Sequence, residues 1–129
     1  MTRRIISSGG PWELPAGYSR AVVVGDACWV SGTTDAGPDG HSRHPGDVAA
    51  QARATLEIVE GALSQAGFAL SEVVRTRIYV TDMATAARPV LAVHGQVFRH
   101  VQPASTLVEV SALVDPSLLV EIEVEARKG

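Results

Sequence analysis

Residues 103–110 (Pro-Ala-Ser-Thr-Leu-Val-Glu-Val) and residues 119–125 (Leu-Val-Glu-Ile-Glu-Val-Glu) decide the fold of this 129-residue chain. Both segments predict β-strands, and the Asp115-Pro116 pair predicts a turn between them. Because side chains alternate along a strand, one face of the second strand is apolar and the other carries three glutamates, Glu121, Glu123 and Glu125. A row of carboxylates along a strand needs water, a cationic partner or a ligand.

The composition predicts one globular domain that spans residues 1–129. The chain is 46% hydrophobic and 19% charged, which is typical of a folded protein with a continuous core. A net charge of -3 gives no general reason to bind nucleic acid or an anionic membrane surface. Apolar runs are too short to cross a bilayer, and the single Cys28 favours a reducing, cytoplasmic location. No ligand spacing suggests a metal or cofactor.

Along the chain, periodicity predicts strands near residues 3–8, 20–24, 27–31 and 73–80, with a loop over residues 9–17. A helix is expected from Asp47, its N-cap, to Gly67, where it stops. A second helix is expected over residues 86–100 with Pro89 in its first turn. This order predicts an α+β fold in which two helices cover one face of a mixed β-sheet.

The uncovered face of such a sheet would combine apolar groups with both signs of charge. We expect it to carry residues from the set Trp29, Arg75, Arg77, Tyr79, Leu107, Glu109, Glu121 and Glu123. This mixture favours burial against another subunit, with the two arginines pairing, within or between chains, with glutamates at 109, 121 and 123. Glu125, the outermost acidic residue, is interpreted as simply hydrated.

No complete catalytic motif is present. Cys28 lies in an apolar strand and is interpreted as an inert buried thiol, and His94 on an apolar stripe as a structural residue. His41 and His44 are interpreted as solvent-exposed loop residues. What remains for chemistry is one carboxylate with nearby hydroxyls and aromatics, a set that leaves enzyme and binder equally open: Glu121, Ser31, Thr33, Thr34, Ser105, Thr106, Trp12 and Tyr18.

Several ordered motifs resemble the reactive-intermediate deaminase family, also called the YjgF or L-PSP endoribonuclease family. They are Trp29-Val-Ser-Gly32, Gly46-Asp-Val-Ala-Ala-Gln-Ala-Arg53, Val74-Arg-Thr-Arg-Ile-Tyr-Val-Thr-Asp82, Pro103-Ala104 with Val108-Glu-Val110, and Val120-Glu-Ile-Glu123. The resemblance extends from about residue 18 to residue 126. It implies a chorismate-mutase-like fold and a homotrimer with small-molecule clefts between subunits.

The resemblance also implies a set of site residues. Glu121 matches the glutamate that positions water, Tyr18 and Gly32 match pocket-lining positions, and Ser31 and Thr106 adjoin matched residues. Deaminating members carry an arginine after Pro-Ala that binds the substrate carboxylate, whereas this chain has Ser105, which cannot form a bidentate cationic contact. Arg77 is a candidate replacement.

Three hypotheses follow from these residues. The first is a divergent hydrolase of small imine-like metabolites, with Glu121 as the catalytic carboxylate. The second is a trimeric small-molecule binder without turnover. The third is a ribonuclease, which the acidic charge balance disfavours.

Overall fold

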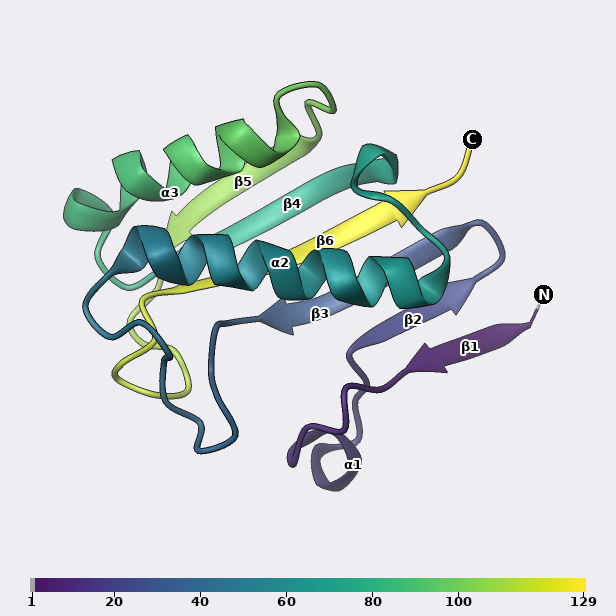
Figure 1. The fold of residues 1–129 in the computed structure, drawn as a ribbon, viewed down its shortest axis with the longest axis horizontal. Coiled ribbons are helices and arrows are strands. Elements are labelled where there is room, and N and C mark those ends of the chain that lie inside the picture. The colour runs from purple at the N-terminus through teal and green to yellow at the C-terminus, as the bar shows by residue number, and fades with distance from the viewer. Residues whose placement is uncertain (1) are drawn as a thin grey trace.

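A six-stranded mixed β-sheet forms the centre of the computed structural model, which describes residues 2–129 (Figure 1). The strands are β1 (Arg3–Ile6), β2 (Ala21–Val24), β3 (Ala27–Thr33), β4 (Val73–Val80), β5 (Ala104–Glu109) and β6 (Val120–Arg127). Their order in the sheet is β1-β2-β3-β6-β4-β5, and only β4 and β5 are parallel. The long helices α2 (Val48–Ala66) and α3 (Met83–Phe98) lie on the same face, which confirms the predicted α+β architecture.

Two short helical segments were not predicted. The loop expected over residues 9–17 contains α1 (Glu13–Ala16), and the 3₁₀ turn η1 (Leu70–Glu72) precedes β4. Helix α1 lies beyond the ends of β1 and β2, away from the two long helices (Figure 1). Within the described residues, no helix is long and apolar enough to cross a membrane.

The boundaries of α2 follow from local capping chemistry, as predicted. The Asp47 side chain accepts a hydrogen bond from the Ala50 amide at 3.0 Å, which satisfies one of the free N–H groups of the first turn. At the other end Gly67 has φ 85°, a left-handed conformation that glycine adopts without steric cost. Sequence-local signals therefore determine both ends of this helix.

Helix α3 corrects the prediction, because it begins at Met83 rather than near residue 86 and ends at Phe98. Pro89 therefore lies beyond the first turn, inside the helix. The earlier start has a tertiary cause: the Glu109 carboxylate at the end of β5 accepts a hydrogen bond from the Met83 amide at 2.9 Å. A carboxylate at a helix N-terminus also interacts favourably with the helix dipole.

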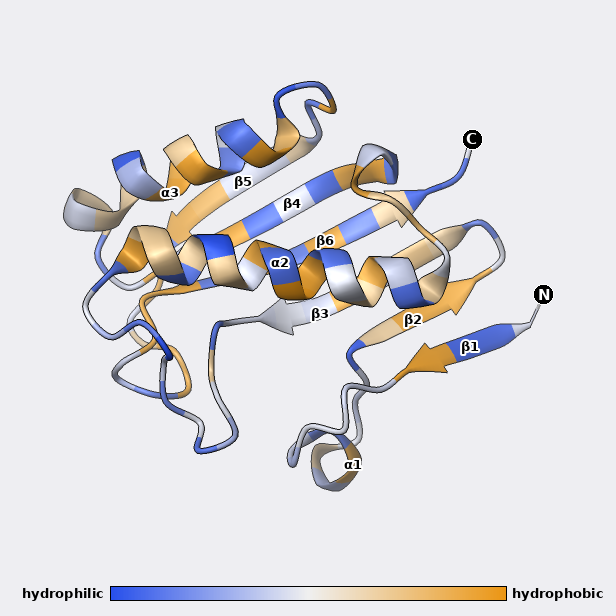
Figure 2. Ribbon diagram, in the orientation of Figure 1, coloured by the Kyte–Doolittle hydropathy of each residue, from blue (hydrophilic) through white to orange (hydrophobic). Residues whose placement is uncertain are grey.

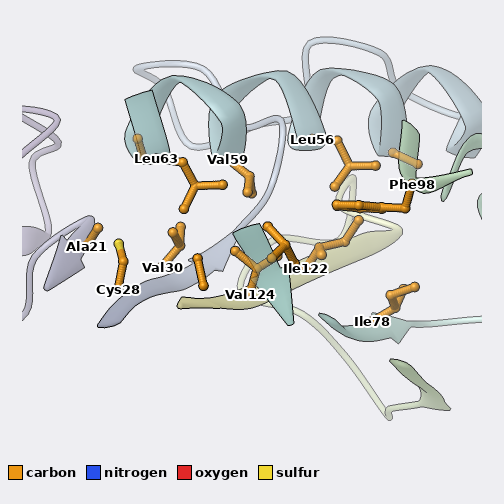
Figure 3. Close-up of a cluster of buried hydrophobic side chains, with 14 of the residues drawn as sticks. Ala21, Cys28, Val30, Leu56, Val59, Leu63, Ile78, Phe98, Ile122 and Val124 are labelled. Carbon is orange, nitrogen blue, oxygen red and sulfur yellow. The ribbon is translucent and has the colours of Figure 1, made fainter. Parts of the chain in front are cut away.

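The hydrophobic core lies between the long helices and the sheet. Figure 3 shows Leu56, Val59 and Leu63 of α2 pointing toward Val30 and Val124 of the strands, and all five side chains are buried. Full burial of a side chain such as Leu63 contributes about 1.5–3 kcal/mol.

A register shift in β4 changes one predicted core residue. The pairing of β4 with β6 skips a residue between Val73 and Arg75, so Val73 is buried and Val74 is 44% exposed. Regular strand alternation would place Val74 on the inner face with Thr76, Ile78 and Val80. The extra residue of the bulge reverses that position only.

The other face of the sheet has no helical cover. Polar and apolar residues alternate along β4 and β6 (Figure 2), and Arg77, Glu123 and Glu125 lie on the uncovered side. Arg77 Nη1 lies 3.0 Å from Glu125 Oε1 and 3.6 Å from Glu123 Oε2, and the Tyr79 hydroxyl donates to Glu123. The predicted arginine–glutamate pairing thus occurs within one chain.

Three details of the uncovered face differ from the prediction. Glu125 is an ion-pair partner of Arg77 and not only hydrated, while Arg75 belongs to none of the ion pairs within residues 2–129. Leu107 and Glu109 lie on the helix side, because their β4 partners in the parallel register are Ile78 and Val80, both fully buried. The register across β4, which the sequence does not reveal, decides which face they take.

A buried glutamine joins the two loops that precede α2 and β6. Gln51 is fully buried on α2, and its side-chain amide donates to the carbonyl oxygens of His44 (3.1 Å) and Ser117 (2.9 Å). Its Oε1 accepts from the Leu119 amide at 2.8 Å. One helix turn later, the hydroxyl of the equally buried Thr55 has no hydrogen-bond partner in the described chain.

Gln51→Leu is expected to lower the free energy of unfolding by roughly 2–4 kcal/mol, because three buried backbone groups would lose their partner. Thr55→Val is the matched control on the same helix. It removes a hydroxyl that bonds to nothing, so its effect should stay within about 0.5 kcal/mol or be stabilising. Equilibrium urea unfolding at one protein concentration measures both, and equal destabilisation of the two variants would contradict this assignment.

Candidate functional site

A β-bulge in β3 shapes the candidate site. Val30 pairs with Val124 of β6 and Thr33 pairs with Ile122, so two residues of β3, Ser31 and Gly32, lie opposite the single Glu123. A bulge of this kind leaves one residue outside the regular ladder and bends the strand locally. β3 therefore continues to residue 33, two residues beyond the predicted strand end.

The carboxylate of Glu121 packs directly on Gly32. A Cβ atom placed on Gly32 would overlap Glu121 Oε2 and lie 3.1 Å from Glu121 Cδ. Only a residue without a side chain leaves this space open. The glycine at the bulge thus allows a carboxylate from the neighbouring strand to lie against the backbone of β3.

Glu121 is the glutamate of β6 that lacks a partner. Within residues 2–129 it makes no ion pair and no side-chain hydrogen bond, whereas Glu123 and Glu125 contact Arg77. Burial raises the pKa of Glu121 above its usual value, the charge of Arg20 opposes that rise, and Glu123 adds to it. A half-buried carboxylate with a raised pKa and free oxygens is suited to exchanging protons with a bound molecule.

Tyr18 and Ser31 line an open pocket of about 510 Å³ beside this bulge. Its walls come from β1, α1, β2 and β3, and apolar side chains such as Ile5 and Leu14 form much of the surface. The Ser31 hydroxyl donates to the Ser19 carbonyl at 2.6 Å, so that side chain is held in place. Tyr18 is 44% exposed and is accessible to a ligand.

Ser105 and Thr106 do not join the other predicted site residues within one chain. Both lie on the edge strand β5, which β4 separates from β6 and Glu121. Ser105 pairs in register with Thr76, and the two hydroxyls are 2.7 Å apart. Thr106 pairs with Arg77 on the uncovered side.

Cys28 and His94 are in structural roles, as expected, and the two loop histidines are exposed but also contact carboxylates. Cys28 is fully buried, and this burial raises the pKa of its thiol. His94 contacts the Thr76 hydroxyl at 2.9 Å, and its ring stacks at a tilt on Phe98. His41 and His44 are exposed, yet their Nδ1 atoms lie 3.0 Å from Asp115 and Asp35, respectively.

No cluster of His, Cys, Asp and Glu side chains within the described residues could hold a metal ion. The candidate site consists of the Glu121 carboxylate, the bulge of β3 and the adjoining pocket lined by Tyr18 and Ser31.

Comparison with known proteins decides the family. The sequence model of the family described as endoribonuclease L-PSP matches residues 13–128. The chain belongs to the YjgF/L-PSP family. An uncharacterized protein from Streptomyces coelicolor, SCO2049, is 35% identical, and the alignment covers 98% of this chain and 92% of the relative. The RutC family protein PH0854 of Pyrococcus horikoshii is 32% identical, with 86% of each chain covered.

A solved structure shows the same fold in a family member. The crystal structure of Rv2704 from Mycobacterium tuberculosis, described as a YjgF/YER057c/UK114 family member, superposes with a TM-score of 0.89 at 47% identity. The match covers 98% of this chain and all of that chain. The likeness confirms the chorismate-mutase-like fold that the sequence resemblance implied.

Arg20, which the sequence alone does not indicate, lies at the candidate site. Its Nη2 donates to the Gly32 carbonyl at 2.6 Å, and its charge acts on Glu121. The residue precedes a predicted strand and belongs to no recognisable motif. The only available signal was its position two residues after Tyr18, on the same side of an extended segment.

Gly32→Ala should return the pKa of Glu121 toward its usual value, because the added methyl group would push the carboxylate off β3 into solvent. The pKa can be followed by NMR of the Glu121 side-chain carboxyl carbon. Gly95→Ala is the matched control, because an added Cβ there meets no atom within 4 Å and Ala favours the helix. An unchanged Glu121 pKa in Gly32→Ala would show that this packing does not set it.

Proposed function

We propose that the protein hydrolyses small imine- or enamine-like metabolites at clefts between the subunits of a homotrimer, with Glu121 as the catalytic carboxylate. One observation carries the proposal. Within residues 2–129, the half-buried Glu121 has a raised pKa, packs on the bulge glycine and makes no side-chain hydrogen bond or ion pair. A carboxylate in these surroundings has no structural contact to explain it, and perturbed carboxylates of this kind concentrate at functional sites.

Hydrolysis would use Glu121 twice. The reacting C=N group is the protonated, iminium form. In the first step the carboxylate takes a proton from water while the water oxygen bonds to the iminium carbon and the C=N π electrons move to nitrogen, which gives a neutral amino alcohol. In the second step the protonated Glu121 donates that proton to the amine nitrogen. The C–N bond then breaks, ammonia leaves, and the remaining hydroxyl releases its proton to solvent to give a carbonyl. One iminium ion and one water thus give a carbonyl compound, ammonia and a proton, and the carboxylate is regenerated.

The uncovered sheet face supports the trimer. Trp29 is 44% exposed and Val108 is 39% exposed on that face, and large exposed apolar groups indicate an interaction surface. The charges beside them are already compensated within the chain by the contacts of Arg77 with Glu123 and Glu125. Burial of this face against another subunit would therefore leave few unpaired charges. In a trimer, a neighbouring β5 would bring Thr106, which lies on the uncovered side, toward the site.

Light scattering at about 10 μM should give three times the 13.5 kDa chain mass. Trp29→Glu should yield monomers, because the new carboxylate would face Glu125, its register partner on β6. Leu91→Glu, an exposed position on α3, is the control and should leave the trimer intact. A monomeric wild-type protein would exclude a site shared between subunits.

Ammonia release from enzymatically generated 2-iminopropionate or an uncharged imine tests the reaction. Glu121→Gln should slow release by at least about 100-fold, since the amide cannot accept the water proton. Glu57→Gln, the same change on the exposed side of α2, should leave the rate unchanged. Equal rates for Glu121→Gln and wild type would remove Glu121 from the mechanism.

The alternative function is binding without turnover, which uses the same cleft. Retention of a small ligand by the wild-type protein, with no ammonia released from any imine supplied, would favour it. Ribonuclease activity, which the family description names, receives less support because the net charge is -3 and the uncovered face carries carboxylates. RNA cleavage lost in Glu121→Gln would favour it instead.

A further inference from the structure

Arg20 is held over the bulge of β3 by two contacts. Its guanidinium Nη2 donates to the carbonyl oxygen of Gly32 at 2.6 Å, and its own backbone carbonyl accepts from the Ser31 amide at 2.9 Å. Arg20 immediately precedes β2, whose first residue Ala21 faces the core. The alternation of an extended chain therefore places the arginine side chain on the uncovered side, with Glu121.

Most of the hydrogen-bonding capacity of Arg20 is unused. An arginine has five N–H donors, and within residues 2–129 this one makes a single side-chain hydrogen bond. Its Nε is buried without a partner, and Arg20 takes part in none of the ion pairs. Arg77, by contrast, is held by two glutamates and cannot readily serve a ligand.

The charge of Arg20 acts on two carboxylates, Glu13 and Glu121, but within residues 2–129 neither forms an ion pair with it. Burial would raise the pKa of Glu13, but hydrogen bonds from Ser8 and Ser7 and the charge of Arg20 lower it overall, so its oxygens are occupied. The pKa of Glu121 remains raised despite Arg20. Among the described residues, the site therefore contains a guanidinium with free hydrogen-bond donors, Arg20, beside a carboxylate without a partner, Glu121.

We propose that Arg20 binds the carboxylate of an anionic substrate and so places the adjacent C=N carbon at Glu121. The substrate class is a short 2-imino acid or its enamine form, in which the carboxylate is bonded directly to the reacting carbon. The fork of a guanidinium matches a carboxylate with two hydrogen bonds. Tyr18 precedes Arg20 by two residues, the Ser31 amide bonds to the Arg20 carbonyl, and both Tyr18 and Ser31 line the adjoining pocket. The role of Arg20 in the reaction rests on the proposed function, whereas its binding of a carboxylate does not.

Binding of pyruvate, the carbonyl product of the simplest 2-imino acid, tests the assignment without turnover. Pyruvamide is the uncharged match. Titration calorimetry and the NMR shifts of the Ser31 and Gly32 amides should show wild-type protein binding pyruvate at least about tenfold more tightly than pyruvamide. Arg20→Gln should abolish this preference and leave pyruvamide binding unchanged.

Control variants keep the test decisive. Arg20→Lys retains the charge but not the forked geometry of the guanidinium, and it should retain part of the preference for pyruvate over pyruvamide. This variant keeps the test informative if Arg20→Gln folds poorly, which circular dichroism would reveal. Arg77→Gln, on the same face but outside the site, should keep the full preference. Loss of the preference in Arg77→Gln would overturn the proposal, as would its survival in Arg20→Gln.

The outcomes separate the two proposals. Pyruvate preference that depends on Arg20, with no ammonia released from any imine, would uphold the anion site and overturn hydrolysis. Ammonia release that depends on Glu121 but is equally fast for Arg20→Gln, with unchanged KM for 2-iminopropionate, would uphold hydrolysis and overturn the anion site. A raised KM in Arg20→Gln for the 2-imino acid alone, and not for an uncharged imine, supports both.

Discussion

The two faces of β6 organise the whole molecule. This strand lies between β3 and β4, so its inner side chains complete the core beneath α2, and its outer glutamates lie at the centre of the uncovered face. Strand alternation allows no exchange between the two sets, because a shift of one residue would bury carboxylates and expose valines. The same eight residues thus supply core packing, a charge cluster with Arg77, and the free carboxylate of Glu121.

Features that depend on local chemistry were predictable from the sequence. The alternation of β6, the apolar stripe of α2 and its ends at Asp47 and Gly67 need no knowledge of distant residues. The corrections to α3, β4 and β5 involve partners far apart in the chain. The start of α3 depends on Glu109, about 26 positions later, and the outward turn of Val74 depends on the register with β6. The faces of β5 depend on its parallel pairing with β4.

The candidate site divides in the same way. Family resemblance indicated Glu121, Gly32 and Tyr18. In the structure Glu121 packs against Gly32, and Tyr18 lines the pocket beside them. The resemblance could not indicate Arg20, whose role arises from a contact with a backbone carbonyl on the next strand. Nor could it show that Ser105 bonds to Thr76 on the helix side of the sheet. Side-chain identity predicts chemistry, but cross-strand register decides which groups meet.

The β3 bulge separates the requirements of the site from those of the fold. If Gly32 were deleted, regular pairing with β6 would match Val30 with Val124, Ser31 with Glu123 and Thr33 with Ile122, and the core would receive the same side chains. The extra residue is therefore not needed for the pairing of the sheet itself. A deletion of one residue would remove the space beneath Glu121 and leave the scaffold beneath the helices in place. The cavity for the carboxylate and the stability of the core are thus separable in this fold.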